Sequence, residues 1–384
     1  MQVHHVAPHF YPETGGAESA LLRLCEFLVE RGHEVVVHTS SRTYQRGRLP
    51  ERGTFGKIEI CRYRPVFRLG YYATLLRPRI EGADVVHLHG YAFLANDWTA
   101  RKMRGRVPLV YSLYHGVAQR PPSAFARAKR ALYDPLFGLK TLSRVDAILP
   151  LSDVDRVWLE ARGFPASKIR VIPTGLDSFA FQAGSPERAR ERVGLRRYVL
   201  YLGRLHREKS VDHLIKAIAS LPQRDVSLAL VGPDAGAKPD LVDLAAASGL
   251  GERVRFLGEV DEPTKRDLLA GCECLVLPSF YESQGIVILE AWAQGRPVVA
   301  SSVGGVPFLV TDGTDGLLYW WGDVPALTRH IEALLTAPAR AAEMGRAGRE
   351  KARTQYAWDR LAPRFEEVYA EVVGRRPSQG SRGP

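Results

Sequence analysis

The 384-residue sequence is poor in the features that mark disulfide-rich and membrane-spanning proteins. Its four cysteines, Cys25, Cys61, Cys272 and Cys274, are too few and too scattered for a disulfide framework, and the close pair lacks the second ligand pair that a zinc site needs. No stretch approaches the roughly 20 apolar residues that span a bilayer. The first residues lack the charged start and apolar run of a signal peptide. We therefore expect reduced, mostly buried thiols and a cytoplasmic protein.

The sequence does have an excess of positive charge, and this excess is confined to one half of the chain. There are 53 lysines and arginines against 42 aspartates and glutamates, a formal net charge of +11. Residues 1–175 hold 26 of the basic and 15 of the acidic residues, so the remainder is neutral. A basic balance favours anionic partners such as phosphorylated ligands, nucleic acid or an acidic membrane surface. Its uneven distribution indicates two domains with different tasks.

Short apolar runs alternate with helical patterns along the whole chain. The runs lie at 3–7, 35–37, 58–60, 85–88, 109–111 and 147–149, and again at 198–202, 228–231, 254–257, 274–277 and 298–299. Such runs indicate parallel strands buried on both faces. We predict two similar α/β domains, residues 1–178 and 179–355, with ligands bound at strand carboxyl ends in the cleft between the sheets. Residues 375–384 have the composition of a disordered tail.

Two loops that follow predicted strands carry groups suited to a phosphorylated ligand. Gly15 and Gly16 form a turn ahead of a helix, where backbone N–H groups can face a negative group, although such a turn alone is more often structural. In the second half, Arg204 and Lys209 place two cations on one short loop after Gly203, an arrangement that suits a diphosphate. Solvated surface charge is the alternative for these cations.

The segment from Glu282 to Glu290 is the most specific motif. Glu282 lies on a loop and is placed to bind sugar hydroxyls, and Gly285 then opens a helix whose first N–H groups can hold phosphate. Glu290 lies within that otherwise apolar helix, where a carboxylate needs a partner such as the two vicinal hydroxyls of a ribose. A helix with one N-terminal acid and one surface glutamate is the alternative.

Together these motifs resemble glycosyltransferase family 4, whose members are retaining enzymes of the GT-B fold. The resemblance covers about residues 1–372 and includes HLHG at 87–90, VIPTG at 171–175, VG at 231–232, FLG at 256–258 and GRPVVA at 295–300. It implies an α/β protein of two Rossmann-like parallel-sheet domains facing across a cleft, with the last helix, about 356–374, returning to the first domain. Trp320 and Trp321 depart from the family pattern, which usually has a smaller apolar residue and a proline there.

The resemblance also implies roles for individual residues. Arg204 and Lys209 would hold the donor diphosphate, Glu282 the donor sugar and Glu290 the ribose. The donor-binding set is Gly15, Gly16, Gly203, Arg204, Lys209, Glu282, Gly285, Ile286, Val287 and Glu290. The catalytic set is His115, Arg204, Lys209 and Glu282, with His115 matching the family's cleft histidine near the donor sugar.

The implied reaction is retaining transfer of a hexose-type sugar from a nucleoside-diphosphate sugar to a sugar, glycan or lipid-linked acceptor, as in cell-envelope or polysaccharide biosynthesis. The leaving phosphate takes the acceptor proton, so neither a protein nucleophile nor a cofactor is required. Asp153 and Asp155 are interpreted as a helix N-terminus rather than a metal-binding DxD motif, so no metal is implied. The alternative is a GT-B enzyme of another class, such as a nucleotide-sugar epimerase or a phosphorylase.

The basic half offers a candidate membrane surface. Ten basic residues, Arg62 among them, are interleaved with six aromatic residues between positions 42 and 79, and Arg127, Lys129, Arg130 and Lys140 form a second group. Basic and aromatic residues together suit an anionic interface, so we expect peripheral attachment to the inner membrane leaflet. A solvated basic face is the alternative. Nucleic-acid binding is disfavoured, because it gives the neutral half and its two glutamates no role.

Overall fold

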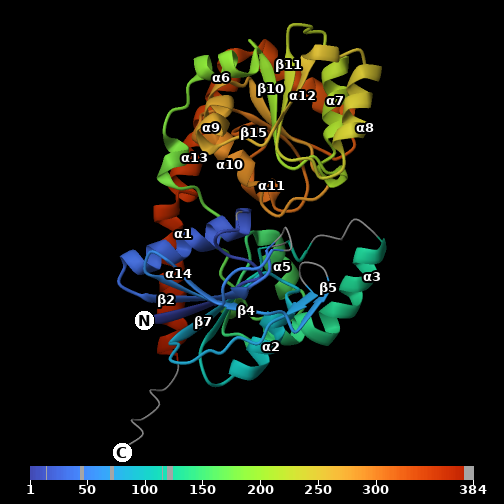
Figure 1. Cartoon of the computed structure of the whole chain (residues 1–384). Helices are drawn as coiled ribbons and strands as arrows, with labels where there is room; N and C mark the ends of the chain where they lie inside the picture. Colours follow the sequence, from blue (N-terminus) through green and yellow to red (C-terminus); the bar gives the residue numbers. More distant parts are fainter. Residues whose placement is uncertain (14, 44–46, 70–72, 115, 119–123, 376–384) are drawn as a thin grey trace, which may run out of the picture. The chain divides into compact units, whose positions relative to one another are not determined.

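The computed structural model describes residues 1–13, 15–43, 47–69, 73–114, 116–118 and 124–375, and the predicted tail at 375–384 lies outside these ranges except for its first residue. The chain divides into two compact units, the first made of Met1–Pro173 with Leu361–Pro384 and the second of Thr174–Arg360. Each unit is an α/β fold built on its own largely parallel sheet (Figure 1). The predicted fold class is therefore confirmed.

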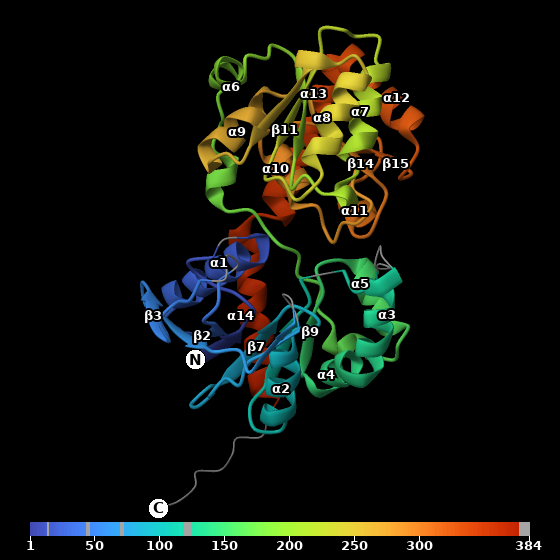
Figure 2. The ribbon, with the colours of Figure 1, turned by 45° about the vertical axis from the view of Figure 1, so that its right-hand side comes forward.

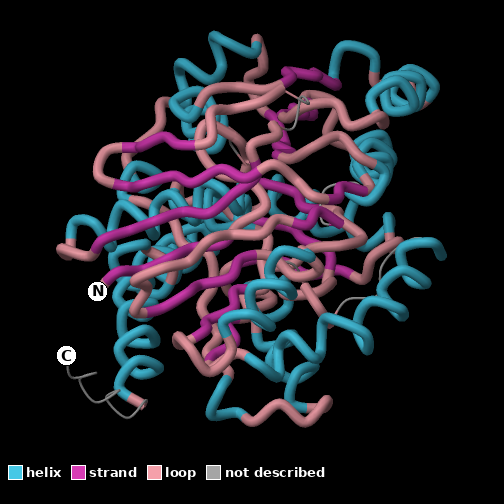
Figure 3. The backbone as a smooth tube through the Cα atoms, turned by 60° about the horizontal axis from the view of Figure 1, so that its bottom comes forward, coloured by secondary structure: helices cyan, strands magenta, loops and turns pink. Residues whose placement is uncertain are grey.

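The sheet of the first unit has seven strands in the order β3-β4-β2-β1-β7-β8-β9. Figure 3 draws the strands of both units in magenta and the helices in cyan. All neighbouring pairs are parallel except β3 and β4. Helices cover both faces, so the central strands are buried along nearly their whole length rather than alternating between buried and exposed residues. The strands of the first unit are β1 (Gln2–Val6), β2 (Glu34–Ser40), β3 (Arg52–Phe55), β4 (Ile58–Tyr63), β7 (Val85–His89), β8 (Leu109–Ser112), β9 (Ala147–Leu149) and a separate hairpin of β5 (Phe67–Leu69) and β6 (Ala73–Leu75).

The two faces of this sheet meet different helices. One face packs Leu88 and Tyr111 against Leu142 and Leu159 of α4 and α5, whereas the other meets α14. Helix α14 begins at Trp358 in the second unit and continues into the first from Leu361, as the resemblance implies for a returning helix. The helices are α1 (Gly16–Glu30), α2 (Leu94–Met103), α3 (Ala124–Tyr133), the π-helical turn η1 (Asp134–Gly138), α4 (Leu139–Arg144), α5 (Asp153–Glu160), the 3-10 turn η2 (Ala166–Lys168) and α14 (Trp358–Gly374).

The sheet of the second unit has six parallel strands in the order β12-β11-β10-β13-β14-β15. Side chains of a strand alternate between its faces, so β10 supplies Val199 and Tyr201 to one core and Tyr198, Leu200 and Leu202 to the other. The strands are β10 (Tyr198–Leu202), β11 (Ser227–Val231), β12 (Val254–Gly258), β13 (Cys274–Leu277), β14 (Val298–Ser301) and β15 (Gly316–Tyr319).

The helices of the second unit lie on both sides of its sheet. Helices α7, α8 and α12 lie on one side, and α6, α9 and α10 lie on the other (Figures 1 and 2). The helices are α6 (Pro186–Val193), α7 (Val211–Ser220), α8 (Lys238–Ala247), α9 (Glu262–Gly271), α10 (Ile286–Ala293), α11 (Val306–Leu309), α12 (Val324–Thr336) and α13 (Pro338–Gln355), with 3-10 turns η3 (Ser178–Phe181), η4 (Arg207–Lys209) and η5 (Gly251–Arg253).

The thiols have the state that the sequence predicts. Cys25, Cys272 and Cys274 are buried and Cys61 is half-buried, and all four are free. Among the helices of the described ranges, none has both the length and the apolar character needed to cross a bilayer.

Two arginines that the sequence assigns to a basic surface point inward instead. Arg62 is 7% exposed and donates from Nη2 to the backbone oxygen of Tyr11 at 2.9 Å. Arg130 donates to the backbone oxygen of Val117 and pairs with Asp134 at 3.3 Å. The expectation that these two residues form part of an anion-binding surface is therefore wrong, because each uses its guanidinium to hold neighbouring backbone.

Candidate functional site

Two loops of the second unit meet at the carboxyl ends of neighbouring strands. Strands β10 and β13 pair in parallel with Val199 opposite Cys274, so the loops that follow them leave the same edge of the sheet. The backbone N–H of Phe280 donates to the backbone oxygen of Glu208 at 2.9 Å, which joins the two loops directly. This edge is where ligands of open parallel sheets bind.

The charged side chains of these loops lie close together. Lys209 Nζ donates to Glu282 Oε2 at 2.8 Å, and the two side chains are 22% and 16% exposed. The Tyr201 hydroxyl donates to the backbone oxygen of Arg204 at 2.9 Å. Burial raises the pKa of Tyr201, the charge of Glu282 raises it further and that of Arg204 lowers it. Both charges therefore act on the same buried hydroxyl, and the structure brings Arg204, Lys209 and Glu282 to one place.

Arg204 differs from its neighbours on the loop. Its side chain is exposed, and within the described ranges it forms no ion pair. Arg207, on the same loop, pairs instead with Asp240 at 3.2 Å. Gly203 anchors the start of the loop, because its N–H donates to the backbone oxygen of Val231 at 2.9 Å. Arg204 is thus a cation presented by a fixed loop.

The second loop ends at the start of helix α10. Gly285 is the N-cap residue with φ of +86°, a left-handed conformation that glycine adopts without strain. The N–H groups at the start of a helix, which here include Ile286 and Val287, have no acceptor within the helix and carry partial positive charge. The side chain of Gln284 accepts from and donates to the backbone of Thr174, at 2.8 Å in each case. The start of α10 is therefore held in place beside Glu282.

Glu290 has a partner that the sequence did not reveal. Its Oε1 accepts from Lys265 Nζ on α9 at 2.7 Å, and Lys265 also pairs with Glu262 at 2.8 Å. Burial raises the pKa of Glu290, and the charge of Lys265 opposes this rise. For Lys265, burial lowers the pKa, but the charges and hydrogen bonds of Glu290 and Glu262 together outweigh it, so the pKa is raised. A small cavity lies beside the pair, lined in part by Phe179 and Gln294.

Trp321, one of the two residues that depart from the family pattern, supports the same loops. Its Nε1–H donates to Ser210 Oγ at 2.9 Å, and its ring meets that of Phe280 edge to face at 4.7 Å. It thus contacts the residue that follows Lys209 and a residue close to Glu282. Trp320 is exposed.

The remaining predicted site residues belong to the first unit. Gly15 is the N-cap residue of α1 and Gly16 its first residue, and a Cβ added at Gly16 would meet nothing within 4 Å. His115 lies outside the described residues. Asp155 Oδ1 accepts from the N–H of Ala118 at 2.8 Å, which fixes the backbone three residues beyond His115.

The motif at Asp153 and Asp155 is the start of a helix, as predicted. Helix α5 begins at Asp153, whose carboxylate pairs with Arg156 at 2.7 Å. Asp155 is buried, which raises its pKa to about 6.

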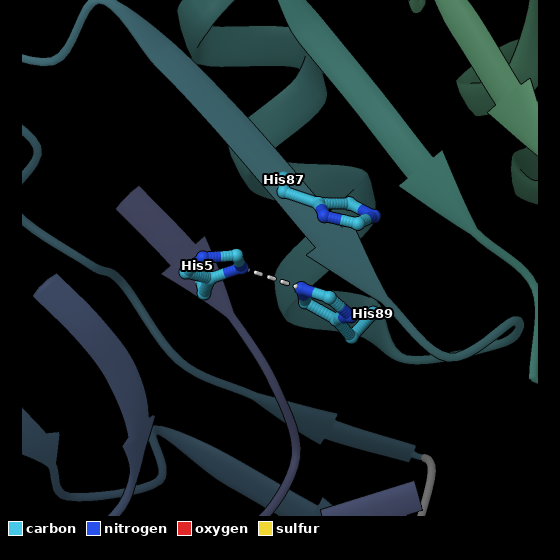
Figure 4. A group of neighbouring side chains, drawn as sticks. All are labelled: His5, His87 and His89. Carbon is cyan, nitrogen blue, oxygen red and sulfur yellow. Dashed lines mark hydrogen bonds between the residues drawn. The ribbon is translucent and has the colours of Figure 1, made fainter. Parts of the chain in front are cut away.

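Three buried histidines, which the sequence analysis did not group, lie together in the first sheet (Figure 4). Their ring nitrogens lie within 4.8 Å of one another, and His5 Nδ1 is hydrogen-bonded to His89 Nε2 at 2.9 Å. His87 uses both nitrogens, with the Tyr369 hydroxyl at 2.6 Å and Ser112 Oγ at 2.8 Å. Burial lowers the pKa of all three, that of His5 to about 3.

Neutral imidazoles can bind a metal, but His87 has both ring nitrogens hydrogen-bonded, so a cation held by all three residues would have to displace one of these two bonds. We therefore interpret the three histidines as core residues of β1 and β7 that are held by hydrogen bonds. His87 also joins the sheet to α14 through its hydrogen bond with the Tyr369 hydroxyl. The signal in the sequence was the repeated histidine in two apolar runs, but their contact depends on strand pairing. His5 lies opposite His87 in the sheet, and that register is not visible in the sequence.

Comparison with known proteins assigns the family. Residues 14–178 match the model for Glycosyltransferase Family 4, and residues 196–337 match that for Glycosyl transferases group 1. The chain is 32% identical over 398 residues to the D-inositol 3-phosphate glycosyltransferase of Mycolicibacterium paratuberculosis, an alignment that covers 96% of this chain and 89% of that protein. The chain belongs to glycosyltransferase family 4.

Other relatives and solved structures agree with this family. The D-inositol 3-phosphate glycosyltransferase of Mycobacterium marinum is 32% identical over 304 residues, which cover 76% of this chain but only 64% of that protein. Sucrose-phosphate synthase from Thermosynechococcus elongatus has a TM-score of 0.81 at 24% identity, covering 98% and 100% of the two chains. Anabaena HepE in complex with UDP has a TM-score of 0.74 at 20% identity, covering 97% and 100%. At these identities the solved structures support the fold alone.

Proposed function

We propose that this family 4 member is a glycosyltransferase that moves a hexose-type sugar from a nucleoside-diphosphate sugar to an acceptor with retention. The observation that carries the proposal is the grouping of Arg204, Lys209 and Glu282 beside the start of α10. Two cations and a helix N-terminus suit a diphosphate, and a carboxylate suits the hydroxyls of the attached sugar.

In the proposed reaction, the acceptor oxygen forms a bond to the anomeric carbon, and the bond from that carbon to the diphosphate oxygen breaks. The electron pair stays on the departing diphosphate, which also takes the proton of the acceptor. Arg204 and Lys209 stabilise the developing charge, so the reaction proceeds without a metal. His115 has the role that the resemblance gives it, near the donor sugar.

The ion pair between Lys209 and Glu282 determines which groups of the donor bind to each of these two side chains. Lys209 Nζ lies 2.8 Å from Glu282 in the structure. A diphosphate competes with the carboxylate for this ammonium and leaves carboxylate oxygens for the sugar hydroxyls. Glu290 binds the ribose in the same way beside Lys265. Supporting this proposal, HepE was solved in complex with UDP-glucose, and the relatives named above are called glycosyltransferases.

The donor is identified first, by thermal shift with UDP-, GDP- and ADP-sugars, because a ligand that binds only the folded state raises its stability. Turnover is then measured as release of nucleoside diphosphate with and without a panel of sugar and inositol-phosphate acceptors. Release that depends on the acceptor supports a transferase. Conversion of the donor without an acceptor, or formation of a sugar phosphate from inorganic phosphate, favours an epimerase or a phosphorylase instead.

A matched pair of arginine variants tests the site. Arg204→Ala removes a cation that faces the proposed diphosphate and is expected to lower turnover by at least about 100-fold. Arg207→Ala removes a cation of the same loop that pairs with Asp240, and is expected to change turnover by less than about twofold. Equal turnover in the two variants would show that the site is assigned wrongly.

We further propose that the acceptor is a sugar, a glycan or a lipid-linked saccharide, and that the protein meets a lipid-linked acceptor as a peripheral protein of the inner membrane leaflet. The basic excess of residues 1–175 supports this, because anionic lipids attract such surfaces. Sedimentation with anionic vesicles at physiological salt tests it.

A further inference from the structure

Helix α3 and the turn η1 that follows it carry their apolar side chains outward. None of the side chains of α3 is buried, and Phe125 and Leu132 are 82% and 64% exposed. In η1, Leu136 and Phe137 are each 47% exposed. Phe125, Leu132 and Leu136 are separated by seven and four residues, which places them along one helical face. A soluble helix normally presents this kind of face to the core of its protein.

The opposite face of the same segment is held by polar contacts. The Tyr133 hydroxyl donates to Asp97 Oδ2 at 2.8 Å. Arg130 pairs with Asp134 at 3.3 Å, and Asp134 also accepts from the Tyr91 hydroxyl at 2.9 Å. The helix is therefore turned with its polar groups toward the protein and its apolar groups away from it. This orientation is fixed by hydrogen bonds and leaves the apolar face uncovered.

The charges around this face are cationic. Lys129 and Lys140 are exposed and form no ion pair among the residues that the structure describes. Asp134 is the only acidic residue between 124 and 140, and its carboxylate is occupied by Arg130 and Tyr91. A second copy of the chain would bring like charges together across an apolar contact of a few side chains. An anionic bilayer accepts both the apolar groups and the cations.

From these observations we infer that residues 124–140 dock onto an anionic lipid bilayer. Phe125, Leu132, Leu136 and Phe137 enter the boundary between headgroups and acyl chains, and Lys129 and Lys140 contact lipid phosphates. The inference rests on the proposed function in one respect only. The bilayer is taken to be the surface on which the enzyme meets a lipid-linked acceptor.

The test uses the full chain and vesicles of phosphatidylcholine with about 30% phosphatidylglycerol, compared with pure phosphatidylcholine at physiological salt. The variant Phe125→Gln with Leu132→Gln removes two exposed apolar groups and keeps residues that suit a helix. Val242→Gln is the matched control, because Val242 is an apolar residue of α8 in the second unit that is 42% exposed. The double variant is expected to lower the vesicle-bound fraction at least tenfold, and the control to leave it unchanged.

A second readout reports where the segment lies. Phe125→Trp adds a tryptophan at the N-terminal end of the proposed contact, and its emission is expected to shift to the blue with anionic vesicles only. The inference is overturned if the wild type stays in solution with anionic vesicles, if the double variant binds them as well as the wild type, or if the double variant abolishes a dimer instead.

Release of nucleoside diphosphate with a water-soluble acceptor separates this inference from the proposed function. The double variant is expected to keep that activity, since none of its changes touches the loops that carry Arg204 and Glu282. Loss of vesicle binding without loss of turnover supports both proposals. Vesicle binding by a protein without turnover supports the docking surface and refutes the transferase.

Discussion

Replacing Gly285 by alanine tests whether the start of α10 holds the donor. Gly285 has φ of +86°, a conformation that costs an alanine about 1 to 2 kcal/mol. The new Cβ would lie 3.1 Å from Ile288 Cδ1 and 3.2 Å from Leu277 Cδ2, so these side chains must shift, which adds roughly 1 kcal/mol. We expect Gly285→Ala to lower the free energy of unfolding by about 2 to 3 kcal/mol.

Gly295→Ala is the matched control at the other end of the same helix. Gly295 has φ of +68°, and a Cβ added there would meet nothing within 4 Å. It therefore carries the conformational cost of about 1 to 2 kcal/mol without the packing cost. Both changes restrict the unfolded chain equally, so that effect cancels in the comparison. Urea unfolding of the two variants measures the difference, which we expect to be about 1 kcal/mol.

Turnover distinguishes a structural from a functional effect of this change. The Cβ at position 285 would also lie 3.6 Å from Glu282 Cγ, so its displacement of the helix start reaches the carboxylate of the site. We expect Gly285→Ala to reduce release of nucleoside diphosphate by at least about tenfold, because small displacements at a reacting centre are costly. Gly295→Ala is expected to keep wild-type turnover. Equal turnover in both variants would refute the assignment of the α10 start to the donor.

Three further changes have defined outcomes. Lys209→Ala is expected to lower turnover about 100- to 1,000-fold, whereas Lys216→Ala, which breaks an exposed ion pair on α7, leaves it unchanged; initial rates compare them. Burial raises the pKa of Asp97 from 3.8 to about 6, so the stability of the wild type falls as pH rises between these values, by up to about 3 kcal/mol. The Asp97→Asn variant has no carboxyl group at this position, so its free energy of unfolding is expected not to fall in this way. Urea unfolding of both proteins at pH 4 and pH 7 measures the effect. A difference in unfolding free energy between the two proteins that is the same at both pH values would contradict burial of Asp97 as the cause. Gly348→Ala places a Cβ 2.2 Å from Cδ1 of the fully buried Trp292 and is expected to destabilise the protein by about 1 to 3 kcal/mol in the same assay, a prediction that an unchanged midpoint would contradict.

The layout of the sheets was predictable because buried parallel strands leave a strong pattern. The apolar runs at 198–202 and 274–277 became β10 and β13, and pairing of such strands in parallel places their following loops at one edge. The meeting of the Arg204 and Glu282 loops also depends on β13 lying beside β10, a strand order that the structure shows and the sequence did not predict. The helix that begins after Gly285 was likewise signalled by its glycine and its apolar run.

Side-chain direction was not predictable in the same way. Arg62 and Arg130 have the composition of a basic surface, yet both turn inward to hold backbone carbonyls. A long charged side chain can reach either solvent or a nearby acceptor, and the choice depends on segments distant in the sequence. Arg62 reaches Tyr11, 51 residues away. The proposed membrane contact therefore rests on the outward apolar face of α3 and not on the number of cations.

The two glutamates of the site show what the fold adds to the motif. Each is already paired with a lysine, Glu282 with Lys209 at 2.8 Å and Glu290 with Lys265 at 2.7 Å. Each pair orients its carboxylate, and removing the lysine would leave a largely buried carboxyl group without its partner. A ligand that has phosphate but no sugar can bind the lysine, but it then leaves the glutamate without a partner. A sugar that has no phosphate can bind the glutamate, but it then leaves the lysine without a partner. In the proposed function, the diphosphate of a nucleotide-sugar binds Lys209 and its sugar hydroxyls bind Glu282, whereas the ribose hydroxyls bind Glu290 and Lys265 keeps Glu262 as a partner. We therefore propose that selectivity for the whole donor rests on two local ion pairs in a unit of almost no net charge, and not on the basic excess of the chain.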